Sequence, residues 1–174
     1  WINHVFHRDH RKIVVIDGKI GYTGGMNIAD YYIKGLPEIG DWRDMHIRVE
    51  GTAVNYLQDI FLDMWNKCTQ QEIGGNIYYP LRNDLASTCQ SGKSVAIIDR
   101  YPRKDPKTMR EVYANAIENA ESKVQIINPY FTPVKRIKKA IKKAVKNGVK
   151  VEVMIPGKSD IGFTPDAALY IANQ

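Results

Sequence analysis

The sequence predicts an α/β fold in which a mixed β-sheet is flanked by helices. Three observations indicate this class: short runs of β-branched residues, apolar residues at helical spacing between those runs, and Gly- or Pro-containing turns where the runs end. The 174 residues are 44% hydrophobic and 25% charged, which is typical of a globular protein. The sequence has no run of about 18 apolar residues that would predict a membrane-spanning helix.

The first half of the chain predicts a β-hairpin, a further strand and one long helix. Asp17-Gly18-Lys19 separates two β-branched runs and is expected to form the hairpin turn. Apolar residues at helical spacing from Val54 to Cys68 predict an amphipathic helix. Strands are expected over residues 12–16, 20–23 and 45–49, and helices over residues 27–32 and 54–68.

The second half follows a polar connecting segment over residues 69–92 and predicts strands that alternate with helices. Asp105-Pro106 is typical of a helix start, and Asn147-Gly148 of a helix end. Strands are expected over residues 94–98, 123–127 and 149–155, and helices over residues 105–120 and 134–146. Because strands and helices alternate, we expect these strands to pair in parallel.

Two side chains near the start of the chain indicate phosphate chemistry. On an extended segment His10 and Lys12 point to the same side, about 7 Å apart at the backbone. Displacement at a phosphodiester requires that negative charge on its oxygens be neutralised, which a lysine ammonium does. A histidine is able to act as a nucleophile or as a general acid near neutral pH.

A glycine pair and an amide complete this candidate site. Gly24-Gly25 allows an oxyanion to approach the backbone, and Asn27 offers an amide donor. Taken separately, each feature is common in loops and strands that have no chemical role. Their joint spacing favours a phosphate-handling site, for which we expect neither a metal nor a cofactor.

These residues form a pattern that resembles a known family. His10-x-Lys12-x4-Asp17 is similar to the H-x-K-x4-D signature of the phospholipase D superfamily, and residues 3–32 and 41–51 resemble bacterial cardiolipin synthases in particular. Residues 127–160, INPYFTPVKRIKKAIKKAVKNGVKVEVMIPGKSD, resemble the opening of the second catalytic repeat in that family. The resemblance implies a phospholipase D-like mixed sheet flanked by helices.

The resemblance also implies a mechanism and a set of site residues. One histidine attacks the phosphorus of a phospholipid and forms a phosphohistidine, while a second histidine protonates the leaving alcohol. Two phosphatidylglycerol molecules then give cardiolipin and glycerol. The implied catalytic residues are His10, Lys12, Asp17 and Asp44, and the implied phosphate ligands are Lys12, Gly25 and Asn27. Asp44 is expected to orient a histidine. Asp17 lies in a tight turn, where we expect a structural role at least as much as a chemical one.

The sequence departs from the family because it holds one signature rather than two. No second H-x-K-x4-D follows residue 27, and the only later histidine is His46. We therefore expect a piece of a longer protein, with residues 1–85 as the C-terminal part of a first repeat and residues 86–174 as the N-terminal part of a second. Such a chain is expected to be inactive as a monomer, unless two copies pair their motifs across a symmetric interface.

Charge and cysteine content bear on partners and location. The formal net charge is +6, and residues 134–150 carry eight Lys or Arg and no acid, which favours an anionic partner such as lipid headgroups or nucleic acid. The resemblance implies phosphatidylglycerol and a membrane surface as the partners, and nucleic acid is not expected. Cys68 and Cys89 are expected to be reduced thiols. The parent protein is expected at the bacterial inner membrane with its catalytic part on the cytoplasmic side, and the fragment itself is expected to be soluble.

Two alternatives remain open at the level of sequence. The same His10 and Lys12 would serve a phosphodiesterase that uses water to hydrolyse a phospholipid or a nucleic acid. A non-catalytic anion-binding module would also use the Gly-Gly-x-Asn loop and the basic helix. Replacement of His10 separates these classes, because a binding module would keep its affinity for anions.

Overall fold

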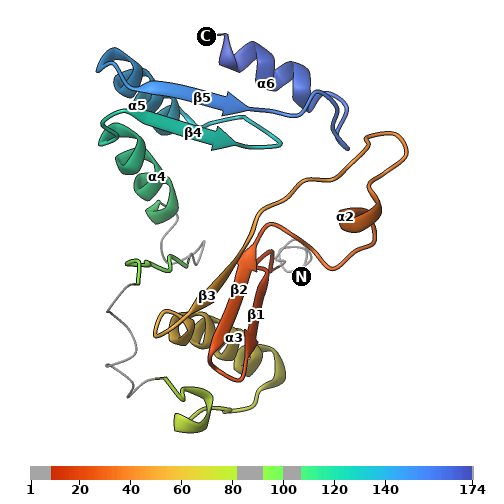
Figure 1. The fold of residues 1–174 in the computed structure, drawn as a ribbon, viewed down its shortest axis with the longest axis vertical. Coiled ribbons are helices and arrows are strands. Elements are labelled where there is room, and N and C mark those ends of the chain that lie inside the picture. Colours follow the sequence, from red (N-terminus) through yellow and green to blue (C-terminus); the bar gives the residue numbers. More distant parts are fainter. Residues whose placement is uncertain (1–8, 82–91, 100–106, 174) are drawn as a thin grey trace. The chain divides into compact units, whose positions relative to one another are not determined.

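A computed structural model describes residues 9–81, 92–99 and 107–173. It divides into two compact units, Trp1–Ile97 and Ile98–Gln174 (Figure 1). The first unit contains a three-stranded antiparallel sheet, and the second contains a two-stranded parallel sheet. Helices pack on both sheets, so the predicted α/β class with mixed strand directions is confirmed. The predicted division at residues 85 and 86 lies outside the described residues and stays a prediction.

The sheet of the first unit is built from β1 (Ile13–Ile16), β2 (Ile20–Gly24) and β3 (His46–Glu50), in that order. Asp17 and Gly18 have φ values of 53° and 63°, which a type I′ turn requires at both central positions. The amide of Lys19 closes the turn by donating to the carbonyl oxygen of Ile16 at 3.0 Å. The predicted hairpin is therefore confirmed.

One face of this sheet is covered by α3 (Val54–Thr69), the predicted amphipathic helix. Gly21 permits the close approach, because a Cβ at this position would lie 2.6 Å from Leu57 Cδ1. Val49 pairs with Gly21 on the neighbouring strand and is also buried. Because side chains alternate along a strand, Val14 and Ile16 project from the other face, where they are 46% and 45% exposed.

The connections of the first unit differ in part from the sequence prediction. The short helix expected over residues 27–32 instead occupies α2 (Tyr31–Lys34), because residues 26–30, after the glycine pair, form irregular backbone, bends and a turn. Beyond α3 the chain forms a 3₁₀ turn, η1 (Asn76–Tyr78). Pro80 and the carbonyl of Tyr78 then pack against Gly18, where a Cβ would lie 2.6 Å from Pro80 Cδ.

The prediction of a strand over residues 94–98 is wrong. Residues 92–99 carry no helix or strand, and no described strand pairs with them. A strand is stabilised by its neighbour rather than by its own sequence, so β-branched residues alone do not create one. The predicted helix start at Asp105-Pro106 and the thiol of Cys89 lie outside the described residues, while Cys68 is an exposed free thiol.

The second unit is a β–α–β arrangement with one helix before it and one after it. Its elements are α4 (Thr108–Glu118), β4 (Lys123–Ile127), α5 (Lys135–Lys146), β5 (Lys150–Met154) and α6 (Thr164–Ala172). β4 and β5 pair in parallel, with Lys123 beside Lys150 and Ile127 beside Met154, as predicted. The sequence analysis missed α6, although Pro165 and Asp166 in its first turn are typical of a helix start.

The core of the second unit lies between the sheet and the pair α4 and α5. Its buried members are Ala114, Ile117, Ala140, Ala144 and Val149. The small alanines allow the two helices to pack closely, because each presents only a methyl group at the contact. Within residues 9–81, 92–99 and 107–173, every helix is too short or too polar to span a bilayer.

Candidate active site

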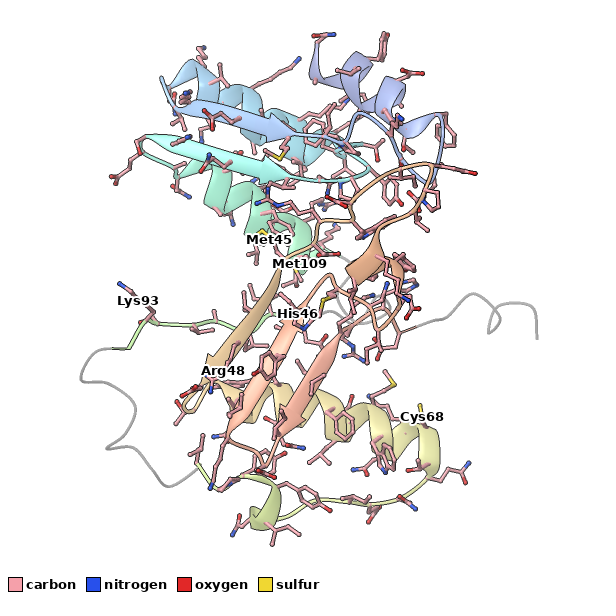
Figure 2. All side chains as sticks on the ribbon, turned by 45° about the vertical axis from the view of Figure 1, so that its right-hand side comes forward. Met45, His46, Arg48, Cys68, Lys93 and Met109 are labelled. Carbon is pink, nitrogen blue, oxygen red and sulfur yellow. The ribbon has the colours of Figure 1, made fainter. Side chains whose placement is uncertain are left out.

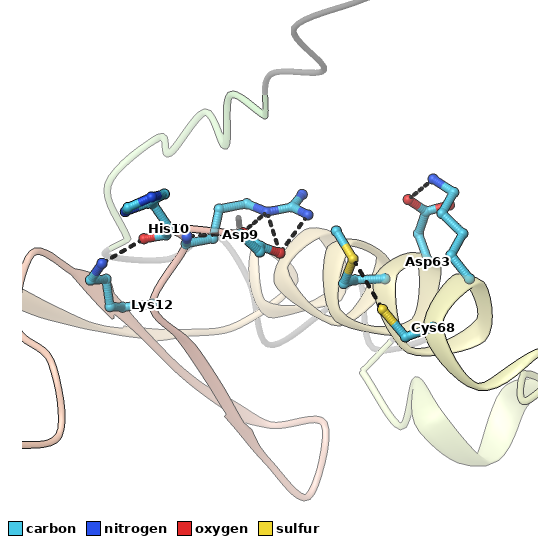
Figure 3. A network of polar contacts seen from close by, with 8 residues as sticks. Asp9, His10, Lys12, Asp63 and Cys68 are labelled. Carbon is cyan, nitrogen blue, oxygen red and sulfur yellow. Dashed lines mark hydrogen bonds and ion pairs between the residues drawn. The ribbon is translucent and has the colours of Figure 1, made fainter. Parts of the chain in front are cut away.

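His10 and Lys12 lie in the segment directly before β1. The Nζ of Lys12 donates a hydrogen bond to the backbone carbonyl oxygen of His10 at 2.7 Å (Figure 3). The imidazole of His10 is exposed, and Lys12 is half-buried. The structure therefore places an ammonium group beside an accessible histidine, although the strand itself begins one residue later, at Ile13.

The neighbouring residues Asp9 and Arg11 fix the direction of this segment. Arg11 Nε and Nη2 donate to the carboxylate of Asp9 at 2.9 and 2.8 Å, and this hydrogen bonding lowers the pKa of Asp9. Asp9, Arg11 and Ile13 line an apolar hollow of about 320 Å³ against α3. Because alternate residues of an extended chain point to opposite sides, His10 and Lys12 project away from α3 (Figure 3).

The glycine pair lies at the same end of the sheet. Ile13 pairs with Thr23 and Gly24 pairs with His46, so the register continued by one residue sets Lys12 beside Gly24. A Cβ on Gly24 would lie 2.6 Å from the Cα of His46 and 2.7 Å from its Nδ1. Glycine at this position therefore allows the backbone and the ring of His46 to approach β2 closely.

Asp44 approaches the second glycine. A Cβ on Gly25 would lie 2.8 Å from Asp44 Cγ and closer still to Oδ1. The amide of Met45 donates to Asp44 Oδ1 at 2.7 Å, and the amide of Gly25 donates to the carbonyl of Met45 at 3.0 Å. Among the described residues no histidine donates a hydrogen bond to Asp44, so its role in orienting a histidine stays a prediction.

Asn27 also lies close to this end of the sheet, but its amide is engaged. Asn27 Nδ2 donates to the hydroxyl oxygen of Tyr32 at 3.0 Å. Burial raises the pKa of Tyr32, and the charge of Asp44 adds to that rise, so Asn27, Tyr32 and Asp44 belong to one neighbourhood. Trp42 packs edge-on against Tyr32, with ring centroids 5.7 Å apart.

Asp17 is not brought to this site. It occupies the β1–β2 turn with a left-handed φ of 53°, at the opposite end of the hairpin from His10. A strand advances about 3.3 Å per residue, so the seven residue steps from His10 to Asp17 correspond to more than about 20 Å. The geometry assigns Asp17 to the turn, and a chemical role for it stays a prediction.

His46 is a candidate site residue that the sequence analysis did not single out. Its Nδ1 is buried and has no hydrogen-bond partner among the described residues, although buried polar atoms are nearly always paired. His46 begins β3, between Met45 and Arg48 in Figure 2, and it shares a face with Gly24. No spacing in the sequence identifies it, because its closeness to Gly24 follows from the register between β2 and β3.

The second unit carries a separate polar cluster at the carboxyl ends of its strands. The hydroxyl of Tyr130, in the loop after β4, donates to Asp160 Oδ1, in the loop after β5, at 2.6 Å. This hydrogen bond lowers the pKa of Asp160. Asn128 Oδ1 accepts from the amide of Tyr130 at 2.9 Å. Ligand sites of α/β sheets are commonly found at this edge.

Comparison with known families supplies the class of protein. Residues 113–173 match the family described as "Cardiolipin synthase, PLD-like domain". The chain is therefore related in sequence to the phospholipase D-like proteins, and among them to the bacterial cardiolipin synthases. No solved structure matches the chain with significance.

Three relatives illustrate the similarity. The chain is 35% identical over 164 residues to the major cardiolipin synthase ClsA of Bacillus subtilis, and 39% identical over 165 residues to cardiolipin synthase 2 of Staphylococcus epidermidis. It is 40% identical over 159 residues to a cardiolipin synthase of Staphylococcus aureus. These alignments cover 90–94% of this chain but 31–33% of each relative, so the chain spans about a third of their length.

Proposed function

We propose that the chain carries one half of a phosphatidyl transferase site that converts two phosphatidylglycerol molecules into cardiolipin and glycerol. The observation that carries this proposal is the position of the Lys12 ammonium, 2.7 Å from the His10 carbonyl oxygen and on the same side as the exposed imidazole. The names of the relatives, which are cardiolipin synthases, support the choice of reaction. The substrate and the acceptor alcohol are part of the proposal.

The proposed reaction has two displacements at phosphorus. A ring nitrogen of His10 attacks the phosphorus of phosphatidylglycerol, a nitrogen–phosphorus bond forms, and the bond from phosphorus to the glycerol oxygen breaks. A second histidine donates its proton to the departing glycerol. The hydroxyl of another phosphatidylglycerol then attacks the phosphohistidine, returns a proton to the second histidine, and releases cardiolipin and free His10.

The roles of the neighbouring groups follow from their positions. Lys12 neutralises negative charge on the phosphoryl oxygens, and Gly25 is proposed as a further phosphate ligand. Asn27 is a further donor once its amide leaves Tyr32. Asp44 is proposed to orient a histidine. Neither a metal nor a cofactor takes part in the scheme.

The second histidine is proposed to come from a second motif. The sequence contains a single H-x-K-x4-D, so residues 1–85 are proposed to end a first repeat and residues 86–174 to begin a second. A monomer of this chain would then lack the acid that protonates glycerol and would not turn over. Two copies paired through their motifs would supply this acid to each other and restore turnover. The membrane surface and the inner-membrane location of a parent enzyme belong to the same proposal.

Covalent labelling tests the nucleophile directly. The chain, at a concentration at which two copies are shown to associate, is incubated with vesicles of phosphatidylglycerol that carries radioactive phosphorus, and acid-labile label on His10 is measured. We expect at most one label per chain, loss of label in His10→Gln, a decrease of at least tenfold in Lys12→Gln, and no change in Lys19→Gln, an exposed lysine at the far end of the hairpin. Equal labelling of wild type and His10→Gln would overturn the proposal.

Product analysis separates the alternatives. Cardiolipin and glycerol as products support transfer, whereas phosphatidic acid and glycerol indicate a hydrolase. Vesicle binding that is unchanged in His10→Gln, with no label in either protein, indicates an anion-binding module. Sustained turnover by a chain shown to be monomeric would contradict the need for a second motif.

A further inference from the structure

The cations of α5 divide into two groups with different surroundings. Arg136 and Lys143 face α4, where Arg136 Nε donates to Glu111 Oε2 at 2.9 Å and Arg136 also pairs with Glu118. Lys143 Nζ lies 3.7 Å from Glu118 Oε2. The acids of α4 therefore neutralise this side of α5 and tie the two helices together.

The remaining cations of α5 form a single-signed strip, which we call the lysine stripe. None of its members has an ion-pair partner among the described residues. At 100° per residue they fall within an arc of about 100°, opposite Ala140 and Ala144, which are fully buried. Four members are exposed and one is half-exposed. The members of the lysine stripe are Lys135, Lys138, Lys139, Lys142 and Lys146.

Apolar side chains border the lysine stripe. Val145 is 55% exposed and follows Lys142 by three residues, so the two side chains are neighbours on the helix surface. Val134, at the start of the helix, is 53% exposed. A helix with a cationic stripe beside exposed apolar residues is suited to the boundary between lipid headgroups and acyl chains.

The chemistry of the stripe favours a lipid surface over nucleic acid. Its cations are all lysines, which act as mobile point charges, whereas the only arginine of the helix is held by Glu111 and Glu118. The stripe contains no aromatic ring on which a base would stack. A diffuse array of anionic headgroups requires neither a planar guanidinium nor an aromatic platform.

We propose that the lysine stripe of α5 docks the second unit on the surface of an anionic lipid bilayer, with Val134 and Val145 entering the headgroup region. The proposal concerns a surface separate from His10 and does not require that His10 turn over any substrate. It assigns to the positive charge of the chain a defined location instead of a general attraction to anions.

Vesicle co-sedimentation of the full chain tests the proposal. The stripe variant K135Q/K139Q/K142Q is compared with K19Q/K93Q/K158Q, which removes the same charge from three exposed lysines outside α5 that form no ion pair among the described residues. Vesicles of phosphatidylcholine with 30% phosphatidylglycerol, at roughly physiological salt, are compared with pure phosphatidylcholine. Each lysine near an anionic surface contributes about fivefold in binding, so we expect a loss of about 100-fold for the stripe variant. The control variant is expected to lose less than about fivefold.

Further variants, and duplex DNA as a second ligand, separate the possible causes of a change in vesicle binding. His10→Gln is expected to bind vesicles as wild type does, so failure of the catalytic proposal and failure of this one are distinguishable. Val145→Ser is expected to weaken vesicle binding several-fold and to leave binding to duplex DNA unchanged. Equal losses in the stripe and control variants would overturn the proposal, because they would indicate net charge alone. A stripe variant that loses DNA binding but keeps vesicle binding would assign the stripe to nucleic acid instead. Circular dichroism of each variant confirms that it is folded.

Discussion

The carboxylate of Asp44 occupies the space that a side chain at Gly25 would fill. A Cβ on Gly25 would lie 2.8 Å from Asp44 Cγ, and Asp44 Oδ1 accepts the amide of Met45 at 2.7 Å. The second glycine of the Gly24-Gly25 pair is therefore required by the packing of this protein itself, in addition to any phosphate that it admits. A functional motif and a local steric requirement coincide at one position.

Gly25→Ala tests this relationship. The added methyl group displaces the Asp44 side chain and breaks its hydrogen bond to Met45, so we expect a loss of about 1 kcal/mol in the free energy of unfolding. Urea denaturation measures it. Gly74→Ala is the matched control, because a Cβ there meets no atom within 4 Å, and it is expected to be neutral or slightly stabilising.

A double-mutant cycle identifies the cause of the destabilisation by Gly25→Ala. In an Asp44→Ala background the carboxylate is absent, so Gly25→Ala is expected to cost less than half of its original effect. A cost that is the same in both backgrounds would show that the methyl group clashes with the backbone instead of with Asp44.

The contact between Gly21 and Leu57 gives the second prediction. Leu57 is 2% exposed and its Cδ1 lies 2.6 Å from the position of a Cβ on Gly21. Gly21→Ala is expected to cost about 1–3 kcal/mol by overpacking, and Leu57→Ala about 2–5 kcal/mol by leaving a cavity. The double variant is expected to cost at least about 1 kcal/mol less than the sum, because the new methyl group enters the space that Leu57 leaves. Strict additivity in urea denaturation would contradict the contact.

The extent to which the sequence predicted this fold depends on how local the stabilising interactions are. The β1–β2 hairpin was predictable because Asp17-Gly18 suits a type I′ turn, and α5 because its apolar residues repeat at helical spacing. The expected strand at residues 94–98 failed, since a strand depends on a partner that its own residues do not encode. The short α2 was displaced because one helical turn is stabilised by tertiary contacts more than by propensity.

The candidate site was predictable to a similar degree. Alternation along an extended chain set His10 and Lys12 on one side, which required only neighbouring residues. His46 was not identified, because its closeness to Gly24 follows from the register between β2 and β3, which sequence spacing does not reveal. Asp17 illustrates the reverse case: a signature residue whose position the turn conformation explains without chemistry.

The unpaired Nδ1 of His46 gives the third prediction. Replacement by Leu removes a buried nitrogen that has no partner among the described residues, so His46→Leu is expected to change the free energy of unfolding by less than about 1 kcal/mol. Val49→Ala, three residues along the same strand at a buried position, is expected to cost about 2 kcal/mol. A loss of more than about 2 kcal/mol for His46→Leu in urea denaturation would mean that Nδ1 is hydrogen-bonded in the folded protein.

Glu152 gives the last prediction, a pH dependence in the second unit. Its carboxylate accepts from Lys123 Nζ at 2.8 Å, from Lys150 Nζ at 2.8 Å and from Gln125 Nε2 at 2.9 Å, and these contacts lower its pKa from the ordinary 4.5 to about 2. Because the pKa is depressed in the folded state, the stabilisation is fully present above pH 4.5 and is lost as the pH falls toward 2.

Unfolding in that window is therefore coupled to proton uptake by Glu152. Wild type is expected to take up close to one proton more on unfolding between pH 2 and 4.5 than Glu152→Gln does, measured from the pH dependence of the urea midpoint. Glu121→Gln, an equal charge change at an exposed residue just before β4, is expected to leave the wild-type slope unchanged. If Glu152→Gln kept that slope, the bridge between Lys123 and Lys150 would not form in solution, and the pairing of β4 with β5 would rest on backbone hydrogen bonds and the apolar face alone.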